Sequence, residues 1–153
     1  MVFIKVEINM NRKIKFRGKS KKTRKWLYGY LGEAKFSILD YVYTDKVIFD
    51  NVLSFNTDNS AYVVKDLSVE EDTIGQFTGL FDKNGTDIYE GDIVLQQGYH
   101  GNKQTMVVKF ECGAFIVGYH KGSSTKPTPM LLNSKCEVIG NIYDNPELIE
   151  QSL

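Results

Sequence analysis

Short apolar segments separated by tight-turn residues fill the sequence between Thr73 and Tyr143, and this spacing most constrains the fold. Asp82-Lys83-Asn84-Gly85 follows one such segment and contains Asn-Gly, the dipeptide most typical of a two-residue β-hairpin turn. Glu111-Cys112-Gly113 separates two more, Thr105 to Phe110 and Ala114 to Tyr119. Short strands joined by tight turns predict a small β-barrel or rolled sheet.

The ends of this region carry further signals. Ile88 to Leu95 should turn at Gly91 and then enter a buried strand, because glycine tolerates a positive φ. The Gly-Asp-Ile-Val sequence there is typical of SH3-type barrels. A last strand is expected from Glu137 to Tyr143, and Asn145-Pro146-Glu147-Leu148 predicts a short C-terminal helix, since asparagine is a good N-cap and proline suits the first helical position.

The first half of the chain also favours strands, because its apolar residues recur at period two. The expected strands are Lys13 to Arg17, Trp26 to Leu31, Phe36 to Tyr43, Lys46 to Leu53 and Ala61 to Lys65. Ser68-Val69-Glu70-Glu71 has capping-box spacing and predicts one helical turn.

We therefore expect a mainly β protein with three parts. These are an N-terminal extension over residues 1–9, a β-rich antiparallel segment with a basic arm over 10–72, and an SH3-like barrel or roll with a short terminal helix over 73–153.

The composition restricts the class of protein and the compartment to which the chain can belong. The chain has 153 residues and is 42% hydrophobic, which is ample for a core. Two cysteines, Cys112 and Cys136, are too few for a disulfide scaffold and form no zinc motif. Met1 to Ile8 alternates apolar and charged residues and lacks the apolar core of a signal peptide, and no segment reaches the ~20 apolar residues that span a bilayer. We expect a cytoplasmic protein without a membrane partner.

A basic arm is the strongest candidate for function. Residues 12 to 25 contain nine basic and no acidic side chains, although the formal net charge of the chain is zero. Such a segment predicts contact with nucleic acid, or docking on the protein's own acidic surface. Tyr28 and Tyr30 would add base stacking. The alternation over Lys13 to Arg17 is equally typical of a strand with one solvated face. The candidate nucleic-acid-binding residues are Arg12, Lys13, Lys15, Arg17, Lys19, Lys21, Lys22, Arg24, Lys25 and Trp26.

Other groups point to chemistry less strongly. His100 and His120 would lie at the same end of a hairpin and share a metal or act as acid and base, but they lack further ligands at a diagnostic spacing. Two exposed histidines at strand ends are the simpler interpretation. Cys112 is expected at the opposite end of that hairpin, too far for a Cys/His pair. It would be a plain turn thiol, or otherwise a core thiol.

Acidic residues near Gly91 suggest a cation site only weakly. Glu90 and Asp92 flank this glycine and could bind a cation together with Asp87, but acids beside a glycine turn are usually solvated. The stretch from Asp82 to Asp87 lacks the glycine and glutamate of a calcium loop. We therefore predict no catalytic residues, no metal and no cofactor.

Three segments together resemble a known family. They are Ile14-Lys15-Phe16-Arg17-Gly18, the segment from Thr73-Ile74-Gly75-Gln76-Phe77 through Asn84-Gly85 to Ile88-Tyr89-Glu90-Gly91-Asp92-Ile93-Val94, and Glu137-Val138-Ile139-Gly140-Asn141 to Leu148. From about Met10 onward the chain resembles the YopX family of phage and prophage proteins. This resemblance implies a β-rich fold with an SH3-type barrel, a phage origin and a bacterial cytoplasmic setting. Family members usually begin just before the first segment, so Met10 is an alternative start to Met1.

The YopX resemblance implies no activity, because the family is one of unknown function with no assigned catalytic residues. The sequence favours a non-enzymatic phage accessory protein that binds nucleic acid or a host or phage protein. One alternative is a small nuclease or toxin-like enzyme on an SH3-like barrel, which rests on fold analogy. The other is a self-associating structural protein whose unpaired strand edges pair between subunits.

Overall fold

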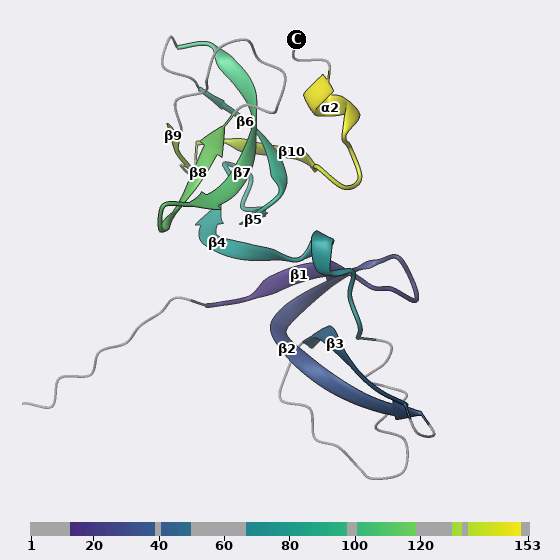
Figure 1. Ribbon diagram of the computed structural model, residues 1–153. Helices are drawn as coiled ribbons and strands as arrows, with labels where there is room; N and C mark the ends of the chain where they lie inside the picture. Colours follow the sequence, from purple (N-terminus) through teal and green to yellow (C-terminus); the bar gives the residue numbers. More distant parts are fainter. Residues whose placement is uncertain are drawn as a thin grey trace, which may run out of the picture.

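The structure, a computed structural model, describes residues 13–38, 41–49, 67–97, 101–118, 130–132 and 135–150. In these residues the chain forms two five-stranded antiparallel sheets, a short 3-10 helix and a short α-helix (Figure 1). The mainly β fold, the antiparallel N-terminal strands and the short C-terminal helix are thus confirmed, whereas the SH3-like form of the second half stays a prediction. No helix within the described ranges is long and apolar enough to cross a membrane.

The first sheet is built around β1. Its strands are β1 (Phe16–Lys19), β2 (Trp26–Ile38), β3 (Tyr41–Phe49), β4 (Gly75–Phe81) and β5 (Asp87–Tyr89), in the order β3-β2-β1-β4-β5. β2 and β3 extend together away from the second sheet (Figure 1). Strands from both sides of the expected boundary at residue 73 pair in this sheet, and that boundary stays a prediction.

Two local predictions in the first half were wrong. The expected strand from Phe36 to Tyr43 is a hairpin, in which β2 ends at Ile38 and pairs with the first residue of β3, Tyr41. The apolar pattern runs through this hairpin without glycine or proline, so periodicity could not locate the reversal. β3 then continues through Thr44 and Asp45, where a gap was expected. The expected strand Ala61 to Lys65 lies outside the described residues.

The helical turn after Ser68 exists, but its cap differs from the expectation. The 3-10 helix η1 (Glu71–Thr73) has Glu70 as its N-cap residue and no side-chain cap hydrogen bond. Ser68 instead forms a β-bridge with Val47, because the backbone of residues 67–69 pairs with the outer edge of β3.

The second sheet contains the main hydrophobic core. Its strands are β6 (Asp92–Gln97), β7 (Lys103–Glu111), β8 (Ala114–Gly118), β9 (Met130–Leu131) and β10 (Glu137–Asn141), in the order β10-β6-β7-β8-β9, and helix α2 (Glu147–Glu150) follows. The fully buried core side chains include Val94, Met106, Val108 and Val117 of this sheet, and Ile88 of β5 in the first sheet packs with them.

The predicted turns are present. β4 and β5 reverse at Asn84-Gly85, where Gly85 has φ +84°, and β7 and β8 reverse at Cys112-Gly113. Cys112 is exposed there, whereas Cys136 lies in the core, where burial raises the pKa of its thiol to about 11. Of the two alternatives expected for Cys112, its place in the exposed turn agrees with a turn thiol and not with a core thiol.

Asp82 connects the β4–β5 turn to the second sheet. Its buried carboxylate accepts hydrogen bonds from the backbone N–H groups of Asn84, Thr86 and Val138. Burial by itself raises the pKa of Asp82, but these N–H donors lower it by more, so the carboxylate stays ionised at neutral pH.

Gly75 allows β4 to approach the chain before β6. A Cβ atom at Gly75 would lie 2.4 Å from the carbonyl oxygen of Glu90, so we predict that Gly75→Ala lowers the free energy of unfolding by about 1–3 kcal/mol. Gly118→Ala in β8 is the matched control, since a Cβ there meets nothing within 4 Å. It should change stability by no more than about 0.5 kcal/mol. Equal unfolding free energies for the two variants in urea titrations would contradict this account.

Candidate functional site

β1 and the residue before it place three cations of the basic arm on one face. Lys15, Arg17 and Lys19 alternate along the strand, so their side chains share a face. Lys15 pairs with Asp87, Arg17 with Asp92 at 2.5 Å, and Lys19 with Asp144 at 2.5 Å. These three cations therefore contact acids from the rest of the same chain.

Aromatic rings lie against the same cations. The Arg17 Cζ atom lies 4.7 Å from the Trp26 ring centroid and 5.2 Å from that of Tyr89, and Lys15 Nζ lies 4.5 Å from the Phe77 centroid. The β1–β2 register places Trp26 opposite Lys19, and Tyr28 opposite Arg17. The cations of this face therefore lie against aromatic side chains of neighbouring strands, and cation–π attraction adds to the ion pairs.

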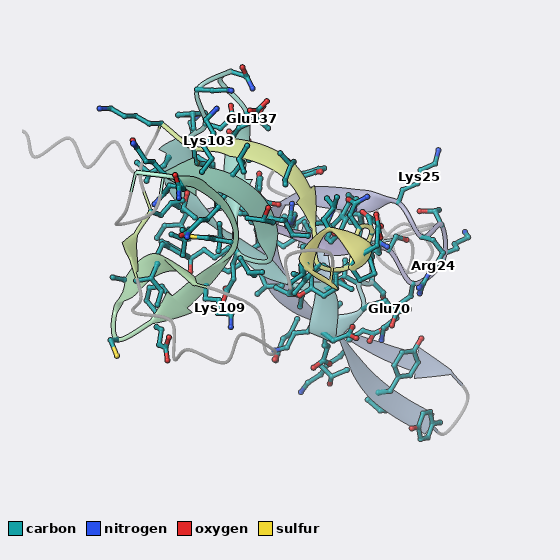
Figure 2. All side chains as sticks on the ribbon, turned by 90° about the horizontal axis from the view of Figure 1, so that it is seen from above. Arg24, Lys25, Glu70, Lys103, Lys109 and Glu137 are labelled. Carbon is teal, nitrogen blue, oxygen red and sulfur yellow. The ribbon has the colours of Figure 1, made fainter. Side chains whose placement is uncertain are left out.

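The turn that follows β1 carries the rest of the described arm. Lys21 donates a hydrogen bond to the carboxylate of Asp45, and this contact raises the pKa of Lys21. Arg24 pairs with Glu70 at 2.6 Å. Figure 2 shows Arg24 turned toward Glu70 and Lys25 extending away from the ribbon. Lys13, Lys22 and Lys25 are exposed, and Arg12 lies outside the described residues. Among the described residues of the arm, ion pairs with acids of the same chain are formed by Lys15, Arg17, Lys19, Lys21 and Arg24.

The pair of Arg17 and Asp92 is the most buried ionic contact of the arm. Their side chains are 7% and 2% exposed. Asp92 Oδ2 accepts the backbone N–H of Tyr89 at 2.7 Å, and Arg17 Nη2 donates to the carbonyl of Glu90 at 3.2 Å. Burial raises the pKa of Asp92, while the Arg17 guanidinium and the Tyr89 N–H act against this rise.

One donor of Arg17 is left without a partner. Its buried Nε has no hydrogen-bond acceptor among the described residues. A buried donor that stays unpaired costs about 1–3 kcal/mol.

Arg17 borders a cleft between the two sheets, which we call the aromatic cleft. Its volume is about 390 Å³. The first sheet contributes Arg17, Tyr28, Asp87 and Tyr89 to its lining, and the second sheet contributes Val138 and Asn141.

Two tyrosines form the aromatic wall of the cleft. The ring centroids of Tyr28 and Tyr89 are 5.6 Å apart and the rings are tilted by 60°. Tyr28 is 50% exposed, whereas Tyr89 is buried and its hydroxyl contacts Asp87 Oδ2 at 3.3 Å. Burial raises the pKa of both phenols, so both hydroxyl groups remain protonated donors at neutral pH.

Asp144 holds Trp26 near the same cleft. Its carboxylate accepts hydrogen bonds from Trp26 Nε1 at 2.6 Å and Asn141 Nδ2 at 3.0 Å and pairs with Lys19. Partial burial raises the pKa of Asp144, but these donors lower it more strongly, to about 2. The carboxylate is therefore ionised across the physiological pH range.

A larger hollow of about 990 Å³ lies between β4 and the β7–β8 hairpin. Four phenylalanines line it, and two of them, Phe81 and Phe110, are about half exposed. Lys13 is its one charged lining residue within the described part of the chain. This hollow lacks the buried ionic groups of the aromatic cleft.

The other predicted groups do not converge on a site. His100 and His120 lie outside the described residues. Asp87 and Asp92 take different cationic partners, and Glu90 Oε1 accepts the backbone N–H of Phe110. Over the described ranges, no three His, Cys, Asp or Glu side chains gather as metal ligands.

Comparison with known protein families matches the YopX protein model over residues 15–150. The chain belongs to the YopX family. The resemblance inferred from the sequence is thus confirmed, and the YopX match spans every residue of the aromatic cleft. A solved structure, protein EF1440 from Enterococcus faecalis, is 21% identical with a TM-score of 0.45, covering 90% of this chain and 98% of that chain. The comparison with curated proteins finds no match.

The buried ion pair predicts a strong energetic coupling between Arg17 and Asp92. Arg17→Met and Asp92→Asn should each lower the unfolding free energy by about 3–5 kcal/mol, because each leaves one buried group without its partner. The double variant should lose less than the sum of the two. Lys83→Met is the control, since its ion pair with Glu137 is exposed and should contribute at most about 1 kcal/mol. Additive losses in a denaturant-based double-mutant cycle would contradict this coupling.

Asp144 predicts a pH dependence of stability. Its folded pKa of about 2 lies below the ordinary value of 3.8, so its contribution is complete above pH 3.8 and is lost as the pH falls toward 2. Asp144→Asn should be less stable than the wild type at pH 7, and the difference should shrink between pH 4 and pH 2. Urea unfolding followed by circular dichroism measures this difference. A difference independent of pH over that interval would refute the assignment.

Proposed function

We propose that this YopX protein is a non-enzymatic binding module that holds a segment of a partner protein in the aromatic cleft. The observation that carries the proposal is that the half-exposed ring of Tyr28 lines a cleft to which both sheets contribute side chains. An aromatic face that lines a cleft and is partly open to solvent is typical of ligand sites. In this proposal the protein is a phage-derived accessory factor in the cytoplasm of a bacterial host.

The charges around the cleft favour a protein partner over a nucleic acid. Arg17 and Lys15 are paired with Asp92 and Asp87, and these two acids also line the cleft. A phosphate group would compete with both carboxylates and be repelled by them. A neutral peptide segment offers carbonyl acceptors and apolar groups without that repulsion.

Partner capture tests this proposal. The tagged full chain is used to capture proteins from lysate of a phage-bearing host, and each captured protein is then purified and titrated by calorimetry. Tyr28→Ala should lose the partner, because this ring lines the cleft. Tyr30→Ala is the matched control, since Tyr30 is similarly exposed on the same strand but does not line the cleft. A partner that binds wild type and Tyr28→Ala with equal affinity would refute the proposal.

Nucleic-acid binding is the second candidate, favoured by the exposed turn after β1. Arg24 is 66% exposed even in its contact with Glu70, and Lys22 and Lys25 are exposed beside it. Binding to single-stranded or duplex DNA should then weaken with salt and with neutralisation of Lys21, Lys22, Arg24 and Lys25. No binding at low salt would remove this candidate.

Self-association is a further candidate, favoured by the far end of the β2–β3 hairpin. Tyr41 and Val42 are 69% and 63% exposed there. Light scattering across a concentration series, run beside the capture experiments, separates a second copy of the chain from another partner protein.

A further inference from the structure

We infer that the larger hollow between β4 and the β7–β8 hairpin is the docking site for the N-terminal segment of the same chain, residues 2–10. The hollow shares no lining residue with the aromatic cleft among the described residues, so the inference is independent of the proposed function. Three observations carry it: the apolar walls of the hollow, the unpaired part of β4 beside it, and the sequence and short tether of the segment.

Pairs of phenylalanine rings line the hollow from two elements. The ring centroids of Phe77 and Phe81 in β4 are 5.7 Å apart, and those of Phe110 and Phe115 in the hairpin are 5.0 Å apart. One ring of each pair, Phe81 and Phe110, is about half exposed. Figure 1 shows the turn of this hairpin beside β4. Apolar surface gathered in this way is stabilised when other apolar side chains cover it.

The edge of β4 beside the hollow extends beyond its pairing with β1. The register pairs of these strands end at Phe16 and Gln76, and within the described ranges β1 has no partner for residues 78–81. Continued by three residues, this register would set Lys13 opposite Gly79, and both of these residues line the hollow. The chain that precedes Lys13 therefore joins the hollow at a strand edge to which a further strand can pair.

The segment before Lys13 has the sequence of an amphipathic strand. Its apolar residues recur at period two, at Val2, Ile4, Val6, Ile8 and Met10. Between them stand Phe3, Lys5, Glu7 and Asn9. Because successive side chains of a strand point to opposite faces, a strand over residues 2–10 would present one wholly apolar face. Docking of this face in the hollow would remove two apolar surfaces from water together.

The short tether favours this segment over a separate partner. Only Asn11 and Arg12 stand between Met10 and Lys13, and Lys13 already lines the hollow. A short linker gives the tethered group an effective concentration on the order of millimolar. A partner protein at micromolar concentration would need an affinity about a thousandfold higher to displace it.

A nitroxide spin label on Cys112 tests the inference in the full chain. Cys112 is exposed in the hairpin turn beside Gly113, which lines the hollow, whereas Cys136, the only other cysteine in the sequence, is buried and should not react. In the ¹⁵N-labelled wild type, the nitroxide should remove most of the intensity of the amide signals from residues 2–10. Chemical reduction of the nitroxide should restore these signals.

Two neighbouring substitutions separate docking from the mere proximity of a tethered segment. Ile8→Asp places a carboxylate on the apolar face, and Asn9→Asp adds the same charge to the opposite face. Burial of an unpaired carboxylate is costly, so the labelled Ile8→Asp variant should keep most of its signal intensity at residues 2–10. Asn9→Asp should be broadened like the wild type. Circular dichroism checks that both variants are folded.

Every outcome decides for or against the inference. Intact signals from residues 2–10 in the spin-labelled wild type would overturn it, and so would equal broadening in the wild type and Ile8→Asp. A mixture of ¹⁵N-labelled chain without nitroxide and nitroxide-labelled chain without ¹⁵N reports contacts between molecules. Equal broadening of residues 2–10 in this mixture would show that the hollow holds the segment of a second copy, and the inference of a same-chain contact would be wrong.

Discussion

The ion pair between Arg17 and Asp92 is the contact on which the rest of the molecule depends. It joins β1, the centre of the first sheet, to the first residue of β6 in the second sheet. Burial of two charges is costly unless both are paired and hydrogen-bonded, and here Tyr89 and Glu90 supply those additional hydrogen bonds. The pair therefore fixes the relative position of the two sheets, and with it the cleft between them.

Much of the fold could be predicted because its signals are local. Asn84-Gly85 and Cys112-Gly113 mark their hairpins through turn chemistry, and Gly91 with φ +83° marks the bend before β6. The β2–β3 hairpin was missed because apolar residues recur on both sides of its turn and no glycine or proline interrupts them. Asp40 is the one turn-forming residue between β2 and β3, and a single aspartate does not locate a reversal.

The cleft could be predicted only in part. The alternation of Lys15, Arg17 and Lys19 showed that they share a face, but a single sequence does not reveal which acid each will meet. Their partners Asp87, Asp92 and Asp144 lie more than 70 residues further along the chain. The same alternation is expected of a strand with a solvated face and of a strand whose charges are buried against the rest of the chain. Only the tertiary packing distinguishes these two cases.

The central claim is that the ion pair between Arg17 and Asp92 fixes the position of the two sheets relative to each other. Residual dipolar couplings of the backbone amides, measured in the wild type and in Asp92→Asn, test this claim most directly because they report the relative orientation of the two sheets. The couplings of both sheets should fit one alignment tensor in the wild type and two different tensors in the variant. A single tensor that fits both sheets in Asp92→Asn would contradict the claim.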